Sequence, residues 1–399
     1  MSLFQFGNNE LKSVFLQLGL LMKFLPFFVC TALASSNYTI EAHEKKTSRA
    51  DSHAPIGVMG DHLHKKGEWM FSYRYMNMQM DGMLSGKNSI SAEQIALTEN
   101  PLSGETMRMG NLADGSPRLM MVPPTYRVSP IDMSMEMHMI GGMYGWSDDI
   151  TMMLMLPIIQ NKMTLLSYGG SSGTNSIGTF DGDTSGLGDV KLSALIKYSE
   201  DGNQKSHFTI GLSFPTGNTT KKGNILPPFA GVMTPAGETV EIDRLGYSMQ
   251  LGSGSYDLLP GFTFYDRDDN LGWGSQISAV VRLDNNDEGY RLGNRLEAQV
   301  WLTNQWQSWI SGSVKMKAFS EGKISGRDDI ITGGMPLFVS SHSGRDQVEL
   351  SIGINLLGED SLLKRHRLAM EFAVPIYQNV NGLQMENDWN LTLGWQKAL

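Results

Sequence analysis

The chain has 399 residues, of which 41% are hydrophobic and only 18% are charged, with 44 glycines, 27 methionines and a net charge of −9. The mean hydropathy of −0.21 excludes a bundle of membrane-spanning helices, and no basic stripe indicates a nucleic-acid partner. Low charge and abundant glycine are typical of outer-membrane barrels, because half of each strand is polar. The length fits one large barrel or two to three soluble domains.

The first residues, 1–42, are expected to form a signal peptide. A basic residue precedes the apolar run FLPFFVCTALA at 24–34, and small and polar residues follow it. Cleavage is expected after Ala34 or Ala42. The only cysteine, Cys30, lies in this run, so the mature chain would have neither disulfides nor thiolate metal sites.

Twelve later segments alternate apolar and polar side chains with the period of a β-strand. They are 68–80, 132–146, 149–160, 188–199, 206–215, 254–265, 271–283, 290–302, 306–319, 346–357, 366–377 and 388–399. Most of them reach the ~9–11 residues that a tilted strand needs to cross a membrane. A soluble β-sandwich is the alternative interpretation of so many strands.

The connections between these segments alternate in length, which favours the barrel. The short connections are 147–148, 200–205, 266–270, 303–305 and 358–365, and the long loops are 81–131, 161–187, 216–253, 320–345 and 378–387, with 284–289 breaking the pattern. Short periplasmic turns and long external loops are typical of outer-membrane barrels. We therefore predict an all-β fold: a transmembrane antiparallel up-and-down β-barrel of about 12 strands over residues 68–399, in the cell outer membrane of a Gram-negative bacterium, with both termini in the periplasm.

Tryptophans gather where the predicted short turns are. Trp301, Trp306 and Trp309 lie around the 303–305 turn, and Trp146 lies at another. Barrels carry such aromatic girdles at the membrane boundary. The four tryptophans are therefore expected to belong to such a girdle.

Two of the predicted strands, 68–80 and 132–146, are rich in methionine. In the second, the methionines alternate with Asp132, Glu136 and His138, so the carboxylate face is expected to line the lumen and the methionine face to meet lipid. In the first, the aromatic residues on one face are expected to meet lipid, which turns the methionines of the other face inward. The lumen-lining candidates are Arg74, Glu136, His138, Lys191, Arg282, Arg295, Glu297 and Glu349.

Three groups of residues are candidates for metal binding. His53, His62 and His64 lie in the arm at 43–67, which is expected to be periplasmic, and a solvated tail explains them equally well. The thioethers of Met76, Met78 and Met80 suit Cu(I), although packing against an apolar solute also explains them. Asp181 and Asp183 have the spacing of the first half of a calcium loop, but Leu192 stands where its bidentate Glu is expected. Copper and calcium are thus possible ligands, and no cofactor is required.

Three stretches carry a resemblance to a known family: GLGDVKLSALIKY at 186–198, FTIGLSFPTG at 208–217 and YSMQLGSGSYDLLPG at 247–261. They resemble the outer-membrane transporter family associated with the MetA pathway of phenol degradation, over residues 130 to 399. The resemblance implies a barrel that passes small, often aromatic or hydrophobic, molecules, and it implies no catalytic residues.

The expected function is therefore an outer-membrane transporter or channel for a small solute, and not an enzyme. The alternative is a copper or other metal-binding outer-membrane protein that uses the Met-rich and His-rich amino-terminal region. The expected partners are outer-membrane lipid, the solute and the barrel-assembly machinery. Loops 81–131 and 216–253 are expected to constrict the lumen, and the apolar residues 119–124 to contact the solute or seal the mouth.

Overall fold

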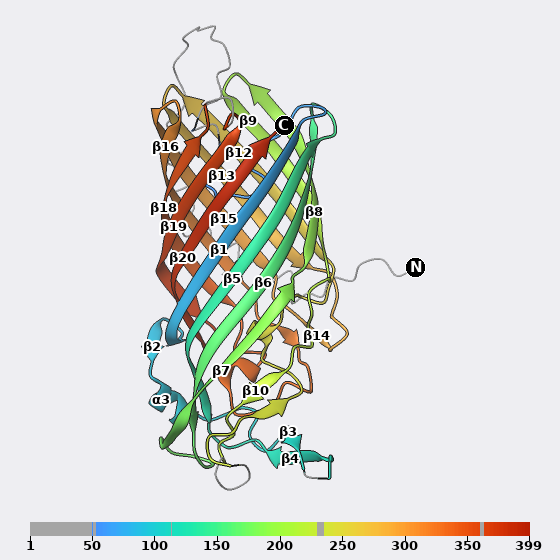
Figure 1. The fold of residues 1–399 in the computed structure, drawn as a ribbon, viewed down its shortest axis with the longest axis vertical. Coiled ribbons are helices and arrows are strands. Elements are labelled where there is room, and N and C mark those ends of the chain that lie inside the picture. Colours follow the sequence, from blue (N-terminus) through green and yellow to red (C-terminus); the bar gives the residue numbers. More distant parts are fainter. Residues whose placement is uncertain (1–49, 51–52, 113, 230–234, 360–362) are drawn as a thin grey trace.

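A computed structural model describes residues 50, 53–112, 114–229, 235–359 and 363–399. The predicted signal peptide lies outside the described residues. Twelve antiparallel strands close into a barrel (Figure 1). They are β1 (Trp69–Ser85), β5 (Val128–Gly145), β6 (Ile150–Tyr168), β8 (Val190–Asp201), β9 (Gln204–Phe214), β12 (Asp257–Asp268), β13 (Leu271–Arg282), β15 (Arg295–Gln307), β16 (Ile310–Glu321), β18 (Arg345–Leu357), β19 (His366–Val380) and β20 (Leu383–Ala398).

The barrel has the up-and-down topology predicted from the sequence. Each strand pairs with its neighbours in chain order, and β1 pairs with both β20 and β5, which closes the sheet. The predicted fold class is confirmed. Strands β1, β5 and β6 are 17, 18 and 19 residues long, well beyond the ~9–11 that a membrane requires. The barrel therefore extends past the membrane.

The two ends of the barrel differ. One end, here called the short-turn end, holds the connections 146–149, 202–203, 269–270, 308–309 and 358–365, together with the start of β1 and the end of β20. The opposite long-loop end holds the connections 86–127, 169–189, 215–256, 283–294 and 322–344. The last connection at that end, 381–382, is much shorter than the predicted 378–387. It is a tight turn in which Gly382 has a φ of +66°.

The remaining elements all gather at the long-loop end, at the bottom of Figure 1. They are β2 (Asn88–Ile90), α3 (Ala92–Leu97), β3 (Thr106–Asn111), β4 (Pro117–Met121), β7 (Ser176–Leu187), β10 (Gly223–Ile225), β11 (Val240–Ile242), η2 (Tyr247–Met249), β14 (Tyr290–Arg291), β17 (Ser325–Gly326) and η3 (Pro336–Phe338). The one α-helix among the described residues begins with a capping box, in which Ser91 and Gln94 each bond to the other's backbone. These elements build a folded cap on the barrel.

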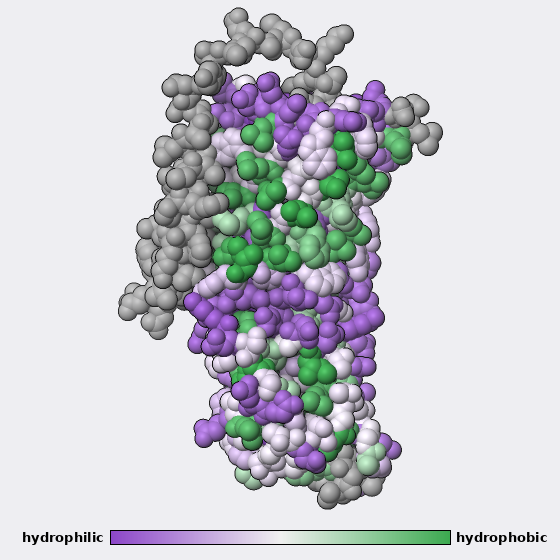
Figure 2. Space-filling view, turned by 90° about the vertical axis from the view of Figure 1, so that its left-hand side faces the viewer, coloured by the Kyte–Doolittle hydropathy of each residue, from purple (hydrophilic) through white to green (hydrophobic). Residues whose placement is uncertain are grey.

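The outer surface carries an apolar belt. Figure 2 shows hydrophobic side chains in a band between polar zones, nearer to the short-turn end. Ile210, Ile352 and Ile376 belong to this outward set, with 55%, 62% and 59% of their surfaces exposed. Exposed branched apolar side chains on alternate strand positions fit contact with lipid. No helix in the described residues is both long and apolar enough to cross a membrane.

The tryptophan prediction is right for three side chains and wrong for one. Trp146, Trp306 and Trp309 are exposed beside short turns. Trp301 is only 2% exposed and packs inside the barrel against Ala54. Its parity explains this position, since it lies two residues from the buried polar Gln299 and so shares the inward face of β15.

Candidate functional site

The amino-terminal segment 53–64 crosses the inside of the barrel at the short-turn end. Ile56 and Val58 are each 1% exposed. Hydrogen bonds join its backbone to five inward side chains on four strands: Arg74 to Ile56, His207 to Gly60, Gln276 to Met59, Arg367 to Ala54 and Glu371 to Gly57. The solvated tail considered from the sequence is thus wrong for this segment. It is a plug, and we call it the luminal plug.

Part of the inner wall is charged and holds the plug. Lys315 and Glu371 are 5% and 6% exposed and form an ion pair of 2.7 Å, and Glu371 also accepts the Gly57 N–H at 3.2 Å. Arg367 donates to the carbonyl oxygen of Ala54 at 2.6 Å. We call seven of the inward charged residues of β15, β16, β18 and β19 the charged sector. Its members are Arg295, Glu297, Lys315, Lys317, Glu349, Arg367 and Glu371.

Six of the eight predicted lumen-lining residues lie on the inner wall. Arg74 reaches the plug, Lys191 lies opposite the inward Met155, and Arg282 pairs with Asp257. In the charged sector, Arg295 pairs with Glu297 at 2.9 Å, and Glu349 pairs with Lys317 at 2.7 Å. Arg282, Arg295 and Lys317 are thus paired with carboxylates inside the wall, which reduces the net charge that could select ions.

Another part of the inner wall is built from methionines. Across β1 and β5, Met76 lies opposite Met137, Met78 opposite Met135 and Met80 opposite Met133, on one face. Residues directly opposite each other on antiparallel strands have touching side chains. We call these three rungs, with their inward neighbours on β1, β5 and β6, the methionine ladder. The neighbours are Met70, Met139, Met143, Met153, Met155 and Met163.

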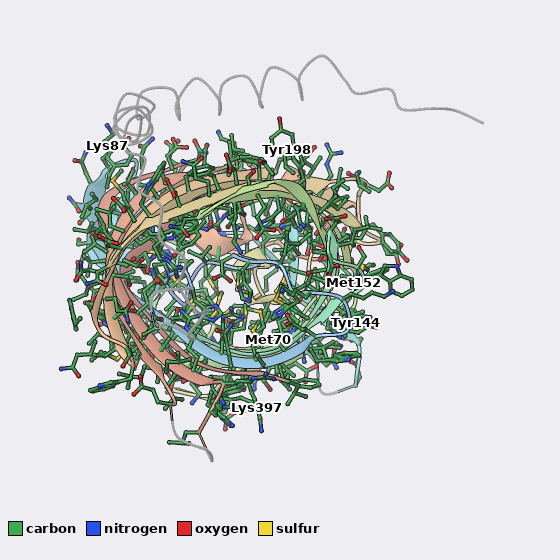
Figure 3. The ribbon with its side chains drawn as sticks, turned by 90° about the horizontal axis from the view of Figure 1, so that it is seen from above. Met70, Lys87, Tyr144, Met152, Tyr198 and Lys397 are labelled. Atoms are coloured by element: carbon green, nitrogen blue, oxygen red, sulfur yellow. The ribbon has the colours of Figure 1, made fainter. Side chains whose placement is uncertain are left out.

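Figure 3 shows sulfur atoms gathered inside the barrel near Met70. The prediction agrees with the structure for the methionines of β1, which were expected to point inward, and is wrong for those of β5, which were expected to meet lipid. Met133 is 1% exposed inside, whereas His138 faces outward, where the Tyr73 hydroxyl lies 2.7 Å from its Nδ1.

Glu136, directly opposite Asn77, shares the outward face with His138, so neither residue lines the lumen. Both residues lie near the middle of β5. Alternation separates the two faces of a strand without saying which face is inside, so the carboxylates did not mark the lumen.

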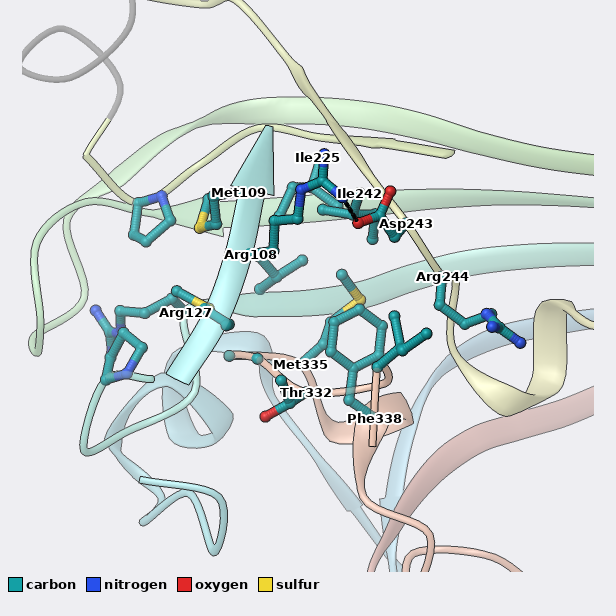
Figure 4. A pocket seen from close by; sticks show the side chains of 17 residues that line it. Arg108, Met109, Arg127, Ile225, Ile242, Asp243, Arg244, Thr332, Met335 and Phe338 are labelled. Carbon is teal, nitrogen blue, oxygen red and sulfur yellow. Dashed lines mark hydrogen bonds and ion pairs between the residues drawn. The ribbon is translucent and has the colours of Figure 1, made fainter. Parts of the chain in front are cut away.

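The cap encloses an apolar pocket at the long-loop end (Figure 4). Its space is about 530 Å³ including the open mouth. It is lined by Met107, Met109, Pro123, Val128, Ile225, Pro228, Ile242, Ile330, Met335 and Phe338, with Arg108, Arg127, Asp243, Arg244 and Thr332 among the polar residues. Arg108 pairs with Asp243 at the rim. An apolar chamber with a few polar groups is the usual form of a small-molecule site.

The pocket and the methionine ladder share one hydrophobic core. Met107 and Met335 of the pocket belong to the same buried cluster as Met80 and Met133, and Met135 packs against that cluster. The next rung, Met76 with Met137, packs against a second, separate cluster, as does Met59 of the plug. Apolar side chains therefore follow one another from the pocket along the ladder to the plug, in two buried clusters.

The apolar residues 119–124 divide between two environments. Leu119 and Met121 are 62% and 70% exposed, whereas Val122 is 2% exposed and Pro123 lines the pocket. The alternation arises because residues 117–121 form the strand β4, which has one face toward the cap and one away from it. Only part of the predicted patch is thus placed to contact a solute.

The predicted calcium site is wrong. Asp181 and Asp183 lie in the extended strand β7, which pairs with β6, and both side chains are exposed. Asp181 accepts a hydrogen bond from Thr164. A calcium loop has to curve so that its oxygens converge, and a paired strand cannot do this.

The histidines of the plug lie together. The rings of His53 and His62 have centroids 4.6 Å apart, and those of His62 and His64 are 4.8 Å apart. Asp61 joins them: its carboxylate lies 2.8 Å from His62 Nδ1 and 3.8 Å from His53 Nδ1. Burial, together with the His62 ring, lowers the pKa of His64 to about 3, so this imidazole is neutral at physiological pH.

Sequence reasoning missed Asp61, Arg367 and most of the pocket. Asp61 directly precedes a His-x-His motif, and this adjacency was a usable signal. The pocket residues come from three separate loops and the start of β5. No periodic pattern brings such residues together, so only the folded cap reveals them.

Neither a protein-family model nor a curated protein matches the sequence. Among solved structures, an outer-membrane channel from Pseudomonas putida F1 is similar, with 13% identity and a TM-score of 0.51 over 86% of this chain and 100% of that one. The fold is that of an outer-membrane β-barrel. Less similar are the toluene transporter TodX from Pseudomonas putida, with 8% identity and a TM-score of 0.40 over 84% of this chain and 91% of that one, and the transport unit of the autotransporter AIDA-I from Escherichia coli, with 10% identity and a TM-score of 0.43 over 86% and 93%. At these identities the likeness shows the fold, and the link to phenol degradation stays a prediction.

Proposed function

We propose that this protein is an outer-membrane channel for small apolar solutes, with aromatic molecules as the expected class. The observation that carries the proposal is the succession of apolar side chains from the pocket along the methionine ladder to the plug, in two buried clusters. The channel activity attributed to the similar Pseudomonas putida barrel agrees with it. The function needs binding and passage only, so it assigns no catalytic residue.

The long-loop end would face the exterior, with both termini in the periplasm. This orientation follows from the loop asymmetry, since bacterial barrels have long external loops and short periplasmic turns. A solute would then enter the pocket first, where Met107 and Met335 are 5% and 4% exposed. The barrel-assembly machinery remains the expected partner for insertion.

Thioethers suit the passage of varied apolar molecules. Methionine is unbranched and polarizable, so its side chain adapts to different shapes and makes favourable contacts with aromatic rings. The rungs Met76–Met137 and Met78–Met135 can change rotamer without leaving a polar group unpaired. The ladder would therefore offer a path of low selectivity among apolar solutes and a barrier to ions.

A carboxylate placed in the pocket tests the proposal. Met335→Glu puts a charge among buried apolar side chains, whereas Leu119→Glu changes an exposed position on the same cap. The readout is uptake of the apolar dye N-phenylnaphthylamine by cells that lack the native protein and express each variant. We expect Met335→Glu to lower the uptake rate about tenfold, the equivalent of ~1.4 kcal/mol, and Leu119→Glu to match the wild type.

Folding and insertion are checked by the mobility of unheated protein in detergent gels. Uptake that is equal in wild type, Met335→Glu and empty-vector cells would reject the proposal. Liposome swelling with a sugar is a second test, because faster passage of the sugar than of the dye would indicate a general polar pore.

A further inference from the structure

The four side chains His53, Asp61, His62 and His64 converge inside the luminal plug. One ligand atom from each of His53, Asp61 and His62 lies within 4.8 Å of the others. The His64 ring adjoins His62 at 4.8 Å between centroids. We propose that these residues bind a divalent transition-metal ion, of the kind that prefers imidazole ligands. This inference goes beyond the proposed passage of apolar solutes.

Two buried nitrogens support the proposal independently of the clustering. His53 Nδ1 and His64 Nε2 have no hydrogen-bond partner among the described residues. His64 is only 7% exposed. A buried polar group without a partner is costly, and a metal ion bound at His53, Asp61 and His62 would satisfy His53 Nδ1.

A simple hydrogen-bonded cluster explains less of the geometry. In that interpretation Asp61 would only accept the Ala54 N–H at 2.9 Å and the bond from His62 at 2.8 Å. Both contacts satisfy Asp61 and leave His53 and His64 unsatisfied. The ion pair of His53 with Asp61 is long, at 3.8 Å, and His53 would have to be protonated to form it.

The ligand chemistry selects the class of ion. Neutral imidazoles with one carboxylate suit Zn²⁺ or Cu²⁺, and an all-oxygen site would be required for Ca²⁺. The ladder methionines lie next to the plug, but they are thioethers, which suit Cu(I) rather than the divalent ions.

The position of the site gives the ion a structural consequence. A bound ion would join residue 53 to residues 61–64, which lie on the two sides of the turn that crosses the lumen. Ala54 is held by the charged sector, whereas Met59 and Leu63 pack against the ladder. A metal that closes this loop would therefore hold the plug in place across the barrel.

Metal binding is measured on the full-length mature protein, purified in detergent and freed of metal with a chelator. Zn²⁺ and Cu²⁺ are titrated separately by calorimetry and by competition with a chelating indicator. We expect one tight site per chain, and a loss of affinity of about 10- to 100-fold in His53→Ala and in His62→Ala. The control His138→Ala removes a histidine from the outer face and should leave the affinity unchanged.

Two further readouts keep the assignment falsifiable if a variant folds poorly. The electron paramagnetic resonance spectrum of the Cu²⁺ form should show coupling to imidazole nitrogens, and the conservative variant Asp61→Glu should retain part of the affinity. Binding of both ions that is only weak, or equal in wild type and His53→Ala/His62→Ala, would overturn the proposal. Tight binding of Cu(I) alone, lost in Met76→Leu/Met137→Leu but kept in the histidine variants, would also overturn the proposal.

Discussion

The methionine ladder and the charged sector are two parts of one inner wall with different physical properties. The ladder presents side chains that adapt their shape, and no rung holds a fixed polar contact. The charged sector consists of desolvated pairs such as Lys315–Glu371, which keep their geometry because an unpaired buried charge is costly. The comparison indicates that the two parts have different roles: the methionine ladder lets a solute pass, and the charged sector holds the plug.

The largest expected effect comes from removing the luminal plug, which both sectors contact. Deletion of residues 53–64 takes away the plug and leaves the strands of the barrel intact. Because a 12-stranded barrel without an inserted segment is open in its centre, we expect ion conductance in planar bilayers to rise roughly tenfold or more. Conductance unchanged from that of the wild type would show that the plug does not close the lumen.

The second-largest expected effect is a difference in the free energy of unfolding between variants of the two sectors. Lys315→Met leaves Glu371 buried without its cation, so the free energy of unfolding should fall by about 3–5 kcal/mol. Met76→Leu, the matched change in the ladder, conserves volume and should cost less than ~1.5 kcal/mol. Urea unfolding in detergent, followed by tryptophan fluorescence, measures both. Equal losses of unfolding free energy in the two variants would contradict the distinction between the charged sector, which holds the plug, and the adaptable methionine ladder.

A smaller effect tests how tightly the charged sector grips the plug. A Cβ added at Gly57 would lie 2.5 Å from Glu371 Oε1 and 2.7 Å from Lys315 Nζ, so Gly57→Ala must push the ion pair or the plug aside. We expect a loss of about 1–3 kcal/mol and faster hydrogen exchange in residues 53–64. Gly142→Ala is the control, because its Cβ meets nothing within 4 Å. Equal rates of hydrogen exchange in residues 53–64 of the two variants would contradict tight binding of the plug by the charged sector.

The architecture was predictable from the sequence because a membrane-facing strand repeats one simple pattern. Alternation located all twelve strands, with β15 the least accurate: 290–302 was predicted, and the strand spans Arg295–Gln307. The predicted segment joined two elements, since Tyr290–Arg291 form the separate strand β14. Alternation defines the two faces of a strand, but not which face is inside. The β5 methionines were assigned outward for this reason.

The candidate site was predictable only in part, because it depends on contacts between distant segments. The inward direction of Met76, Met78 and Met80 followed from the aromatic face of their own strand. The burial of His53, His62 and His64 did not, since the plug carries no strand or helix pattern and is ordered by side chains about 100 to 300 residues away. Such long-range order leaves almost no local signal.

The most direct test of the account asks where an apolar solute lies inside the folded protein. A diazirine-bearing alkylbenzene is photolysed with the purified barrel in detergent, with and without excess alkylbenzene, and the adducts are mapped by mass spectrometry. The account predicts displaceable adducts on Met107 and Met335 in the pocket and on Met76 and Met137 in the ladder. Displaceable adducts confined to the charged sector, or adducts only on lipid-facing residues such as Ile352 that excess solute does not displace, would contradict it.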